Sequence, residues 1–163
     1  MEELQEKSCC FIGHRKIEQS VQLERYVKDL VENLIIKEKV QKFYFGSKSE
    51  FNSMCYDIVS ELKLKYEYIK RVYCRSSFEY ISDSYKEFLL SNYEETYFPE
   101  KCHKAGKLAY IKRNEEMINK SDICVYYCNQ NCKIEKIKSG TIIAYEYAKR
   151  KNKVIINVCE KLH

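Results

Sequence analysis

The sequence predicts an α/β fold of the Rossmann-like type, with helices on both faces of a mostly parallel sheet of five or more strands. Five short apolar runs alternate with segments in which apolar residues recur at helical spacing. Only four Gly and one Pro occur, which disfavours the many turns of a β sandwich or barrel. No repeat or linker interrupts the chain, so we expect residues 1–163 to form a single three-layer domain.

The first elements follow from apolar spacing. Residues 9–12 form the first apolar run, and the period from residue 20 to about 38 predicts a helix. Residues 42–45 predict a second strand. Ser47, with Glu50 three residues later, fits a capping box. The helix that it opens is expected to bury Phe51, Met54, Cys55, Ile58, Val59 and Leu62.

The middle of the chain is less regular. Residues 68–74 predict a third strand, and residues 82–92 predict a helix that is followed by a surface excursion before Pro99. The sequence does not determine the role of residues 78–105. Helical spacing returns over residues 106–120.

The last part predicts two more strands. Residues 122–128 are almost continuously apolar, which is typical of a strand buried on both faces. A Lys-rich loop, a helix over about 141–151 and a final strand over 154–158 follow. Ligands of parallel sheets bind outside the carboxyl ends of the strands, where the strand order reverses. We therefore expect functional residues directly after the strands.

Composition excludes several classes of protein. The net charge of +5 suits an anionic ligand but lacks the dense basic stripe of a dedicated nucleic-acid binder. The first eight residues do not resemble a signal peptide, and no apolar run approaches the ~20 residues that span a bilayer. We expect a cytoplasmic protein without membrane contact, whose nine cysteines are thiols.

Three loops with small residues follow predicted strands. Glycine lets the backbone approach a ligand, and a helix N-terminus holds phosphate through unpaired N–H groups. A glycine after a strand can equally be a simple turn, and Lys133, Lys136 and Lys138 can equally belong to a solvated loop. The candidate binding residues of these loops are Gly13, His14, Arg15, Gly46, Ser47, Ser139, Gly140 and Thr141.

The helix over 106–120 carries two further candidates. Arg113 can clamp a phosphate through two hydrogen bonds, and Asn114 can bond a ribose or a base; both also fit an ordinary polar helix face. Glu146 is a candidate acid–base group, or a surface residue.

No metal or other cofactor is predicted. Cys124, Cys128 and Cys132 recur every four residues, but no partner His or Cys pair has zinc-site spacing. No His can be placed beside a Cys to make a nucleophile.

Four groups of residues resemble, in order, the motifs of YpsA-like proteins in the SLOG superfamily, which includes the Lonely Guy phosphoribohydrolases and the DNA-processing protein DprA/Smf. The resemblance implies a Rossmann-like nucleotide site, with Gly13, Arg15, Gly46, Ser47, Arg113, Asn114, Gly140 and Thr141 at corresponding positions. Members either bind nucleotide-derived signals or cleave nucleoside monophosphates. The motifs are residues 10–15, 43–47 with 51–52, 113–118 with 121–122, and 139–141 with 147–148.

One departure separates the two activities. The phosphoribohydrolases carry a Glu three residues after the loop Thr, where this chain has Ala144; Glu146 lies about 200° further round the helix. We therefore expect the chain to sense or sequester a nucleotide or a nucleotide-derived signal, such as a cyclic nucleotide or an ADP-ribose-type molecule. The alternative is a nucleoside 5′-monophosphate phosphoribohydrolase, an N-glycosidase that uses Glu146, Glu115 or Glu116.

Two expectations concern larger partners. Fifteen Tyr could stack on single-stranded nucleic acid, although so many tyrosines are more typical of core and rim positions. The Tyr-rich middle segment suits an interface between copies of the chain, so we expect a homo-oligomer, either a dimer or a tetramer.

Overall fold

The computed structural model describes residues 6–129 and 139–161 of the chain. Within them one six-stranded sheet has the order β4-β3-β2-β1-β5-β6, and every neighbouring pair is parallel. The Rossmann-like α/β class is confirmed, and the described sheet is wholly rather than mostly parallel. The strands are β1 (Lys7–Gly13), β2 (Val40–Phe45), β3 (Lys70–Cys74), β4 (Glu95–Tyr97), β5 (Ile123–Tyr127) and β6 (Val154–Asn157).

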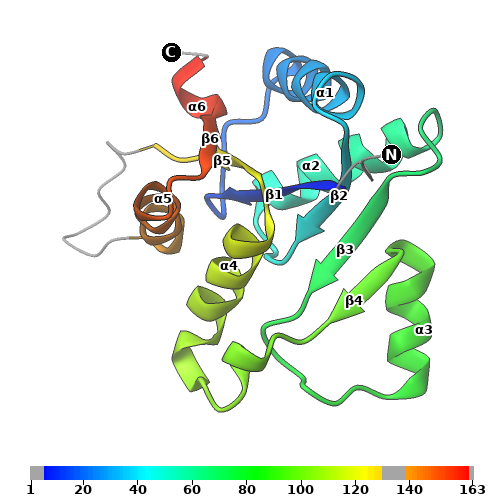
Figure 1. Ribbon diagram of the computed structural model, residues 1–163, viewed down its shortest axis with the longest axis vertical. Helices are drawn as coiled ribbons and strands as arrows, with labels where there is room; N and C mark the ends of the chain where they lie inside the picture. Colours follow the sequence, from blue (N-terminus) through cyan, green and yellow to red (C-terminus); the bar gives the residue numbers. More distant parts are fainter. Residues whose placement is uncertain (1–5, 130–138, 162–163) are drawn as a thin grey trace, which may run out of the picture.

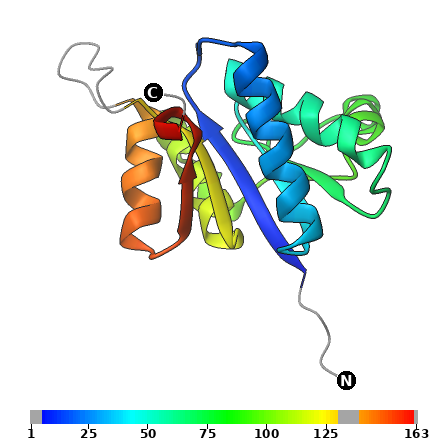
Figure 2. The ribbon, with the colours of Figure 1, turned by 90° about the horizontal axis from the view of Figure 1, so that it is seen from above.

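Helices cover both faces of this sheet (Figures 1 and 2). They are α1 (Val21–Ile36), α2 (Glu50–Lys63), α3 (Asp83–Asn92), α4 (Ala109–Lys120), α5 (Gly140–Arg150) and α6 (Val158–Lys161), with short 3-10 turns at Glu100–Cys102 and Gly106–Leu108. Buried residues of α1, α2 and α6 share one core, and those of α4 and α5 share the other. The result is three layers, with α3 beside the edge strand β4.

Alternation along the strands divides the core in two. Phe11 and Val125 face α1 and α2, whereas Cys10 and Tyr126 face α4 and α5. β1 and β5 are buried on both faces, as their continuous apolar runs predict. The eight cysteines of the described part are buried, so they serve as small core residues.

The strand order reverses beside β1. From β1 the chain adds β2, β3 and β4 on one side, and then returns through α4 to place β5 on the other side of β1. The connections that leave β1 and β5 therefore run in opposite directions. Such a reversal opens a crevice beyond the carboxyl ends of the strands.

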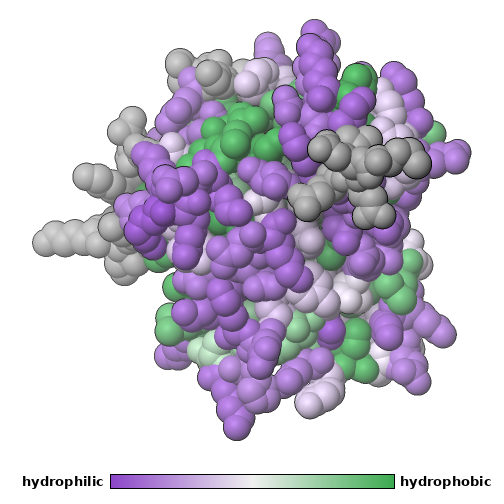
Figure 3. Space-filling view, in the orientation of Figure 1, coloured by the Kyte–Doolittle hydropathy of each residue, from purple (hydrophilic) through white to green (hydrophobic). Residues whose placement is uncertain are grey.

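The outer surface is mainly hydrophilic on the face in Figure 3, where hydrophobic side chains form separate small groups. No helix of the described residues has the length and apolar character needed to cross a lipid bilayer.

One predicted element is wrong. The helix over 82–92 is confirmed as α3, but the segment before Pro99 is no surface excursion, because Glu95–Tyr97 pairs with β3 as β4. The Glu94 carboxylate accepts hydrogen bonds from Arg71 Nε (3.1 Å), Nη2 (2.7 Å) and backbone N–H (2.9 Å). These bonds hold β4 in place, and a half-buried strand of three residues has no apolar pattern that could reveal it.

The predicted capping box is also wrong. The N-cap of α2 is Ser49, whose Oγ accepts from the Asn52 backbone N–H at 3.0 Å. Glu50 is the first helical residue, and its carboxylate accepts from the Ile17 N–H at 2.8 Å. Ser47 therefore stays in the loop before the helix, where its Oγ lies 3.0 Å from Ser49 Oγ.

We predict that Glu94→Gln destabilises the fold in a pH-dependent way. Burial opposes ionisation of Glu94, but hydrogen bonds from Arg71 lower the pKa of its carboxyl. The stabilisation is present above the unfolded pKa of about 4.3 and is lost as the pH falls through the folded value. Urea denaturation should give a loss of about 1–3 kcal/mol near neutral pH that shrinks in acid.

Glu38→Gln is the matched control, because it removes a carboxylate from the exposed Lys7–Glu38 pair at 3.6 Å. We expect a change within about 0.5 kcal/mol there. Equal losses in the two variants would contradict the special role of the Arg71–Glu94 pair.

Candidate functional site

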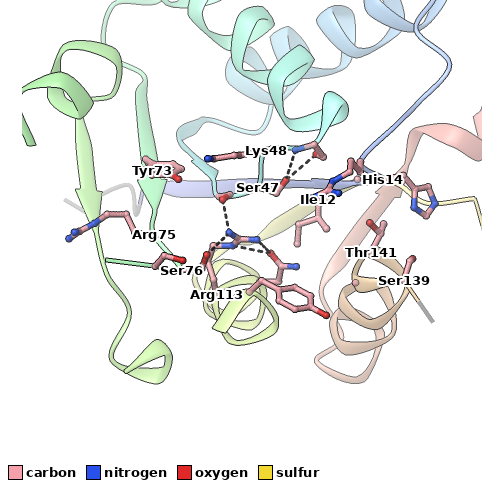
Figure 4. A pocket seen from close by; sticks show the side chains of 18 of the residues that line it. Ile12, His14, Ser47, Lys48, Tyr73, Arg75, Ser76, Arg113, Ser139 and Thr141 are labelled. Carbon is pink, nitrogen blue, oxygen red and sulfur yellow. Dashed lines mark hydrogen bonds between the residues drawn. The ribbon is translucent and has the colours of Figure 1, made fainter. Parts of the chain in front are cut away.

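A cavity of about 570 Å³ lies beyond the carboxyl ends of β1, β2 and β3, beside α4 and the start of α5 (Figure 4). Small-molecule sites typically measure roughly 300–1000 Å³. Four segments that the sequence analysis singled out meet here, although contact of their residues with a ligand remains a prediction. All ten predicted binding residues line the cavity: Gly13, His14, Arg15, Gly46, Ser47, Arg113, Asn114, Ser139, Gly140 and Thr141.

The lining is positively charged. It contains Arg15, Lys48, Arg75 and Arg113, and none of its residues within the described part of the chain is Asp or Glu. Cations and hydroxyl donors together suit an anion such as phosphate. The hydroxyl groups belong to Ser47, Ser49, Ser76, Ser77, Ser139 and Thr141.

Arg113 is the most deeply buried of these cations, with 6% of the residue exposed. Its Nη1 donates to the Gly46 carbonyl (2.6 Å) and to Ser76 Oγ (3.1 Å). Its Nε and Nη2 each lie 3.4 Å from Asn114 Oδ1 (Figure 4). It makes no ion pair with a carboxylate of the described residues.

Within the described part of the chain, the charge of Arg113 is consequently compensated only by neutral groups. Burial lowers the pKa of its guanidinium, yet an arginine stays protonated in proteins. A buried cation without a carboxylate carries a desolvation cost that an anionic ligand would offset.

Gly46 is required by the path of the Arg113 side chain. A Cβ at residue 46 would lie 2.6 Å from Arg113 Cδ and 2.8 Å from Nε. Gly13 has a similar role, because its Cβ would lie 2.4 Å from Cδ2 of Phe51. Neither glycine has a positive φ, so space rather than backbone freedom explains them.

Two helix N-termini border the cavity. α2 begins after Ser49, and α5 begins after Ser139, whose Oγ accepts from the Ile142 N–H at 3.2 Å. In α2 the Glu50 N–H is already bonded to the Arg15 carbonyl at 2.8 Å. The remaining N–H groups of the two first turns, with the positive ends of the helix dipoles, favour an anion. Thr141 adds a hydroxyl at the start of α5, on the side of His14 (Figure 4).

His14 connects the loop after β1 to the segment that follows β5. Its Nε2 accepts a hydrogen bond from the Asn129 backbone N–H at 2.9 Å, and its ring lies edge-on to Tyr127. Accepting through Nε2 requires a neutral imidazole, and burial lowers the pKa of His14. His14 therefore positions the loop and adds no positive charge near neutral pH.

The β3 side of the cavity was not predicted from the sequence. Arg75, Ser76 and Ser77 directly follow β3 and obey the rule that identified the other loops, but they include no glycine to draw attention. Four aromatic residues were also missed, because only the fold distinguishes them from the other aromatic residues. They are Tyr73, Phe78, Tyr85 and Tyr110.

The candidate acids lie outside the lining. Glu146 on α5 and Glu115 and Glu116 on α4 are not among the residues that border the cavity. Ala144, where the phosphoribohydrolases have Glu, is 3% exposed and belongs to the core. Its carbonyl accepts from the Tyr126 hydroxyl at 3.1 Å, so this position faces the sheet.

A metal site needs several ligating side chains close together. Among residues 6–129 and 139–161, no group of three or more His, Cys, Asp and Glu could hold a metal ion. The predicted loop residues Cys132, Lys133, Lys136 and Lys138 lie outside the described residues.

Comparisons with known proteins leave the family open. No protein-family model matches the chain, and no curated protein matches it at a significant level. The resemblance to YpsA-like proteins therefore rests on the motifs alone.

We predict that Gly46→Ala destabilises the protein by roughly 1–3 kcal/mol, because the added methyl must displace the buried Arg113 side chain. Gly140→Ala is the control, since its Cβ would meet only the ring of half-exposed Tyr110, at 3.2 Å. We expect that variant within about 1 kcal/mol of the wild type. Chemical denaturation measures both, and a Gly46→Ala protein of wild-type stability would refute the packing argument.

We also predict that His14 makes stability fall in mild acid. Its pKa is lower in the folded than in the unfolded chain, so the unfolded state binds the proton first, from about pH 6.5 downward. Stability is complete above that pH and decreases as the pH falls toward the folded value. In His14→Gln the free energy of unfolding should fall less steeply over this range, and parallel curves for the two proteins would contradict the assignment.

Proposed function

We propose that the chain binds a phosphate-bearing nucleotide or nucleotide-derived signal in this cavity, and senses or sequesters it. The observation that carries the proposal is the buried Arg113, which has no carboxylate partner among the described residues and lines a cavity at the reversal of the strand order. A bound phosphate would supply the missing negative charge.

The surrounding groups support the same ligand class. The starts of α2 and α5 offer backbone N–H donors, and hydroxyls of Ser47 and Thr141 lie beside them. Asn114, 7% exposed, can bond a ribose hydroxyl or a base edge. Cyclic nucleotides and ADP-ribose-type molecules combine all the chemical groups that this lining could recognise.

Binding without turnover is the simpler expectation. Cleavage of an N-glycosidic bond needs an acid–base group near the leaving base, and the described lining has no carboxylate. A stable complex with an unchanged nucleotide is what such a lining favours.

The test is native mass spectrometry after incubation with nucleoside monophosphates, cyclic nucleotides and ADP-ribose. We expect one intact nucleotide to be retained and released on denaturation. Free base with ribose phosphate in the supernatant would instead indicate the hydrolase, and no retention at millimolar concentration would refute the proposal.

We predict that Arg113→Gln weakens binding of the retained nucleotide by roughly 10- to 100-fold, because a charge-assisted hydrogen bond is lost. Stability of the ligand-free protein should fall by less than about 3 kcal/mol, because the lost bonds to the Gly46 carbonyl and Ser76 are partly offset by removal of the desolvation cost of a buried charge. Calorimetric titration and urea denaturation measure the two effects.

Arg25→Gln is the matched control, because it makes the same change of charge at an exposed position of α1. It should leave affinity unchanged. An equal loss of affinity in both variants would mean that net charge, rather than the Arg113 contact, attracts the ligand.

A further inference from the structure

The two sides of the cavity differ in chemistry. The loops after β1 and β2 and the start of α5 contribute hydroxyls and backbone N–H groups, with one ring, Tyr110, beside Gly140. β3 and the segment after it contribute three of the four Tyr and Phe rings of the lining, Tyr73, Phe78 and Tyr85, together with the hydroxyls of Ser76 and Ser77. A nucleotide has the same division, with an anionic phosphate at one end and a flat aromatic ring at the other. Proteins bind such rings by stacking them on aromatic side chains.

Of the three aromatic residues on the β3 side, Phe78 is best able to accept a ring. Tyr73 is stacked on Tyr93 (5.2 Å between ring centroids) and Tyr85 on Phe88 (6.4 Å), so each has one face covered. No ring of the described residues packs on Phe78, which is 70% exposed. A single exposed apolar residue is common in proteins, so the inference depends on where Phe78 lies in the cavity.

Hydrogen bonds fix the loop before Phe78. The Arg75 backbone N–H donates to the Tyr97 carbonyl at 2.9 Å, which ties the loop to the edge strand β4. Arg75 Nη1 donates to the Phe78 carbonyl at 2.8 Å, and the Arg75 side chain is directed away from Arg113 (Figure 4). Arg75 therefore holds the loop.

The loop is also held on either side of Phe78. Ser76 Oγ accepts from the buried Arg113 at 3.1 Å, and the Glu79 carboxylate lies 2.7 Å from His103 Nδ1. Phe78 itself has a φ of 61°, a left-handed conformation that is unfavourable for a bulky residue. Such conformations persist where surrounding contacts enforce them, often at ligand clamps.

We propose that the β3 side of the cavity is the ring subsite of the nucleotide site, with Phe78 stacking on the base and Arg75 acting as a positioning residue. The inference rests on the proposed function and adds the orientation of the ligand. The phosphate lies toward Arg113 and the starts of α2 and α5, and the base lies toward the loop after β3. The inference predicts that a phosphate carrying an aromatic ring binds more tightly than a plain sugar phosphate.

Titration with the four ribonucleoside 5′-monophosphates, cyclic nucleotides, ADP-ribose and ribose 5-phosphate tests this orientation. The wild type should bind at least one ring-bearing probe more tightly than ribose 5-phosphate. Phe78→Ala should weaken that probe by roughly 5- to 100-fold and change ribose 5-phosphate less than about twofold, because only the ring loses its partner. Phe78→Tyr should retain most of the affinity for the ring-bearing probe, because it keeps an aromatic ring. If Phe78 had only a structural role in the loop, its substitutions would change the affinities for both probes together.

Tyr80→Ala is the matched control. Tyr80 is an aromatic residue of the same loop that is 88% exposed and does not line the cavity, so its removal should change neither affinity. If Phe78→Ala leaves the ratio of ring-bearing to ring-free affinity unchanged, the ring subsite is wrong while the proposed function stands. If the wild type binds none of the probes, the proposed function fails, and this inference fails with it.

Discussion

The positive charge of Arg113, buried at the carboxyl edge of the sheet, is the constraint around which the site is built. Its guanidinium is bonded to the Gly46 carbonyl, which brings α4 against the loop after β2. That approach leaves no room for a side chain at residue 46. The same guanidinium bonds Ser76, so one cation links the connections of β2, β3 and α4. A charge in this position is costly alone and favourable beside an anion, which is the physical basis of the proposal that the cavity binds a phosphate.

The topology explains why these groups meet. The chain builds β1 to β4 outward in one direction and then crosses back through α4 to place β5 beside β1. α4 thus carries Arg113 and Asn114 to the edge where the loops after β1, β2 and β3 end. His14 joins the two sides of the reversal through its bond from Asn129. The cavity follows from this reversal rather than from any one motif.

Three of the four Tyr and Phe rings of the lining lie on the β3 side of the cavity, and the two sides depend on different parts of the fold. The charged side uses the central strands and two helix starts, which the buried core holds rigidly. The aromatic side uses the loop after β3, whose position depends on the edge strand β4 and on bonds made by Arg75 and Glu79. If the proposed orientation holds, changes in the edge segment would alter the preference for a base without altering the phosphate contacts.

By itself the sequence determined the fold class and the charged side of the cavity. Continuous apolar runs identify β1 and β5, and the residues directly after strands converge because carboxyl ends of parallel strands share one edge. Only the tertiary structure decided the rest. β4 has three half-buried residues and depends on a bond between Arg71 and Glu94, which are 23 residues apart. Ser49 rather than Ser47 caps α2, and Glu146 lies outside the lining. Local patterns report periodicity and propensity, whereas these features depend on contacts between segments that are distant in the chain.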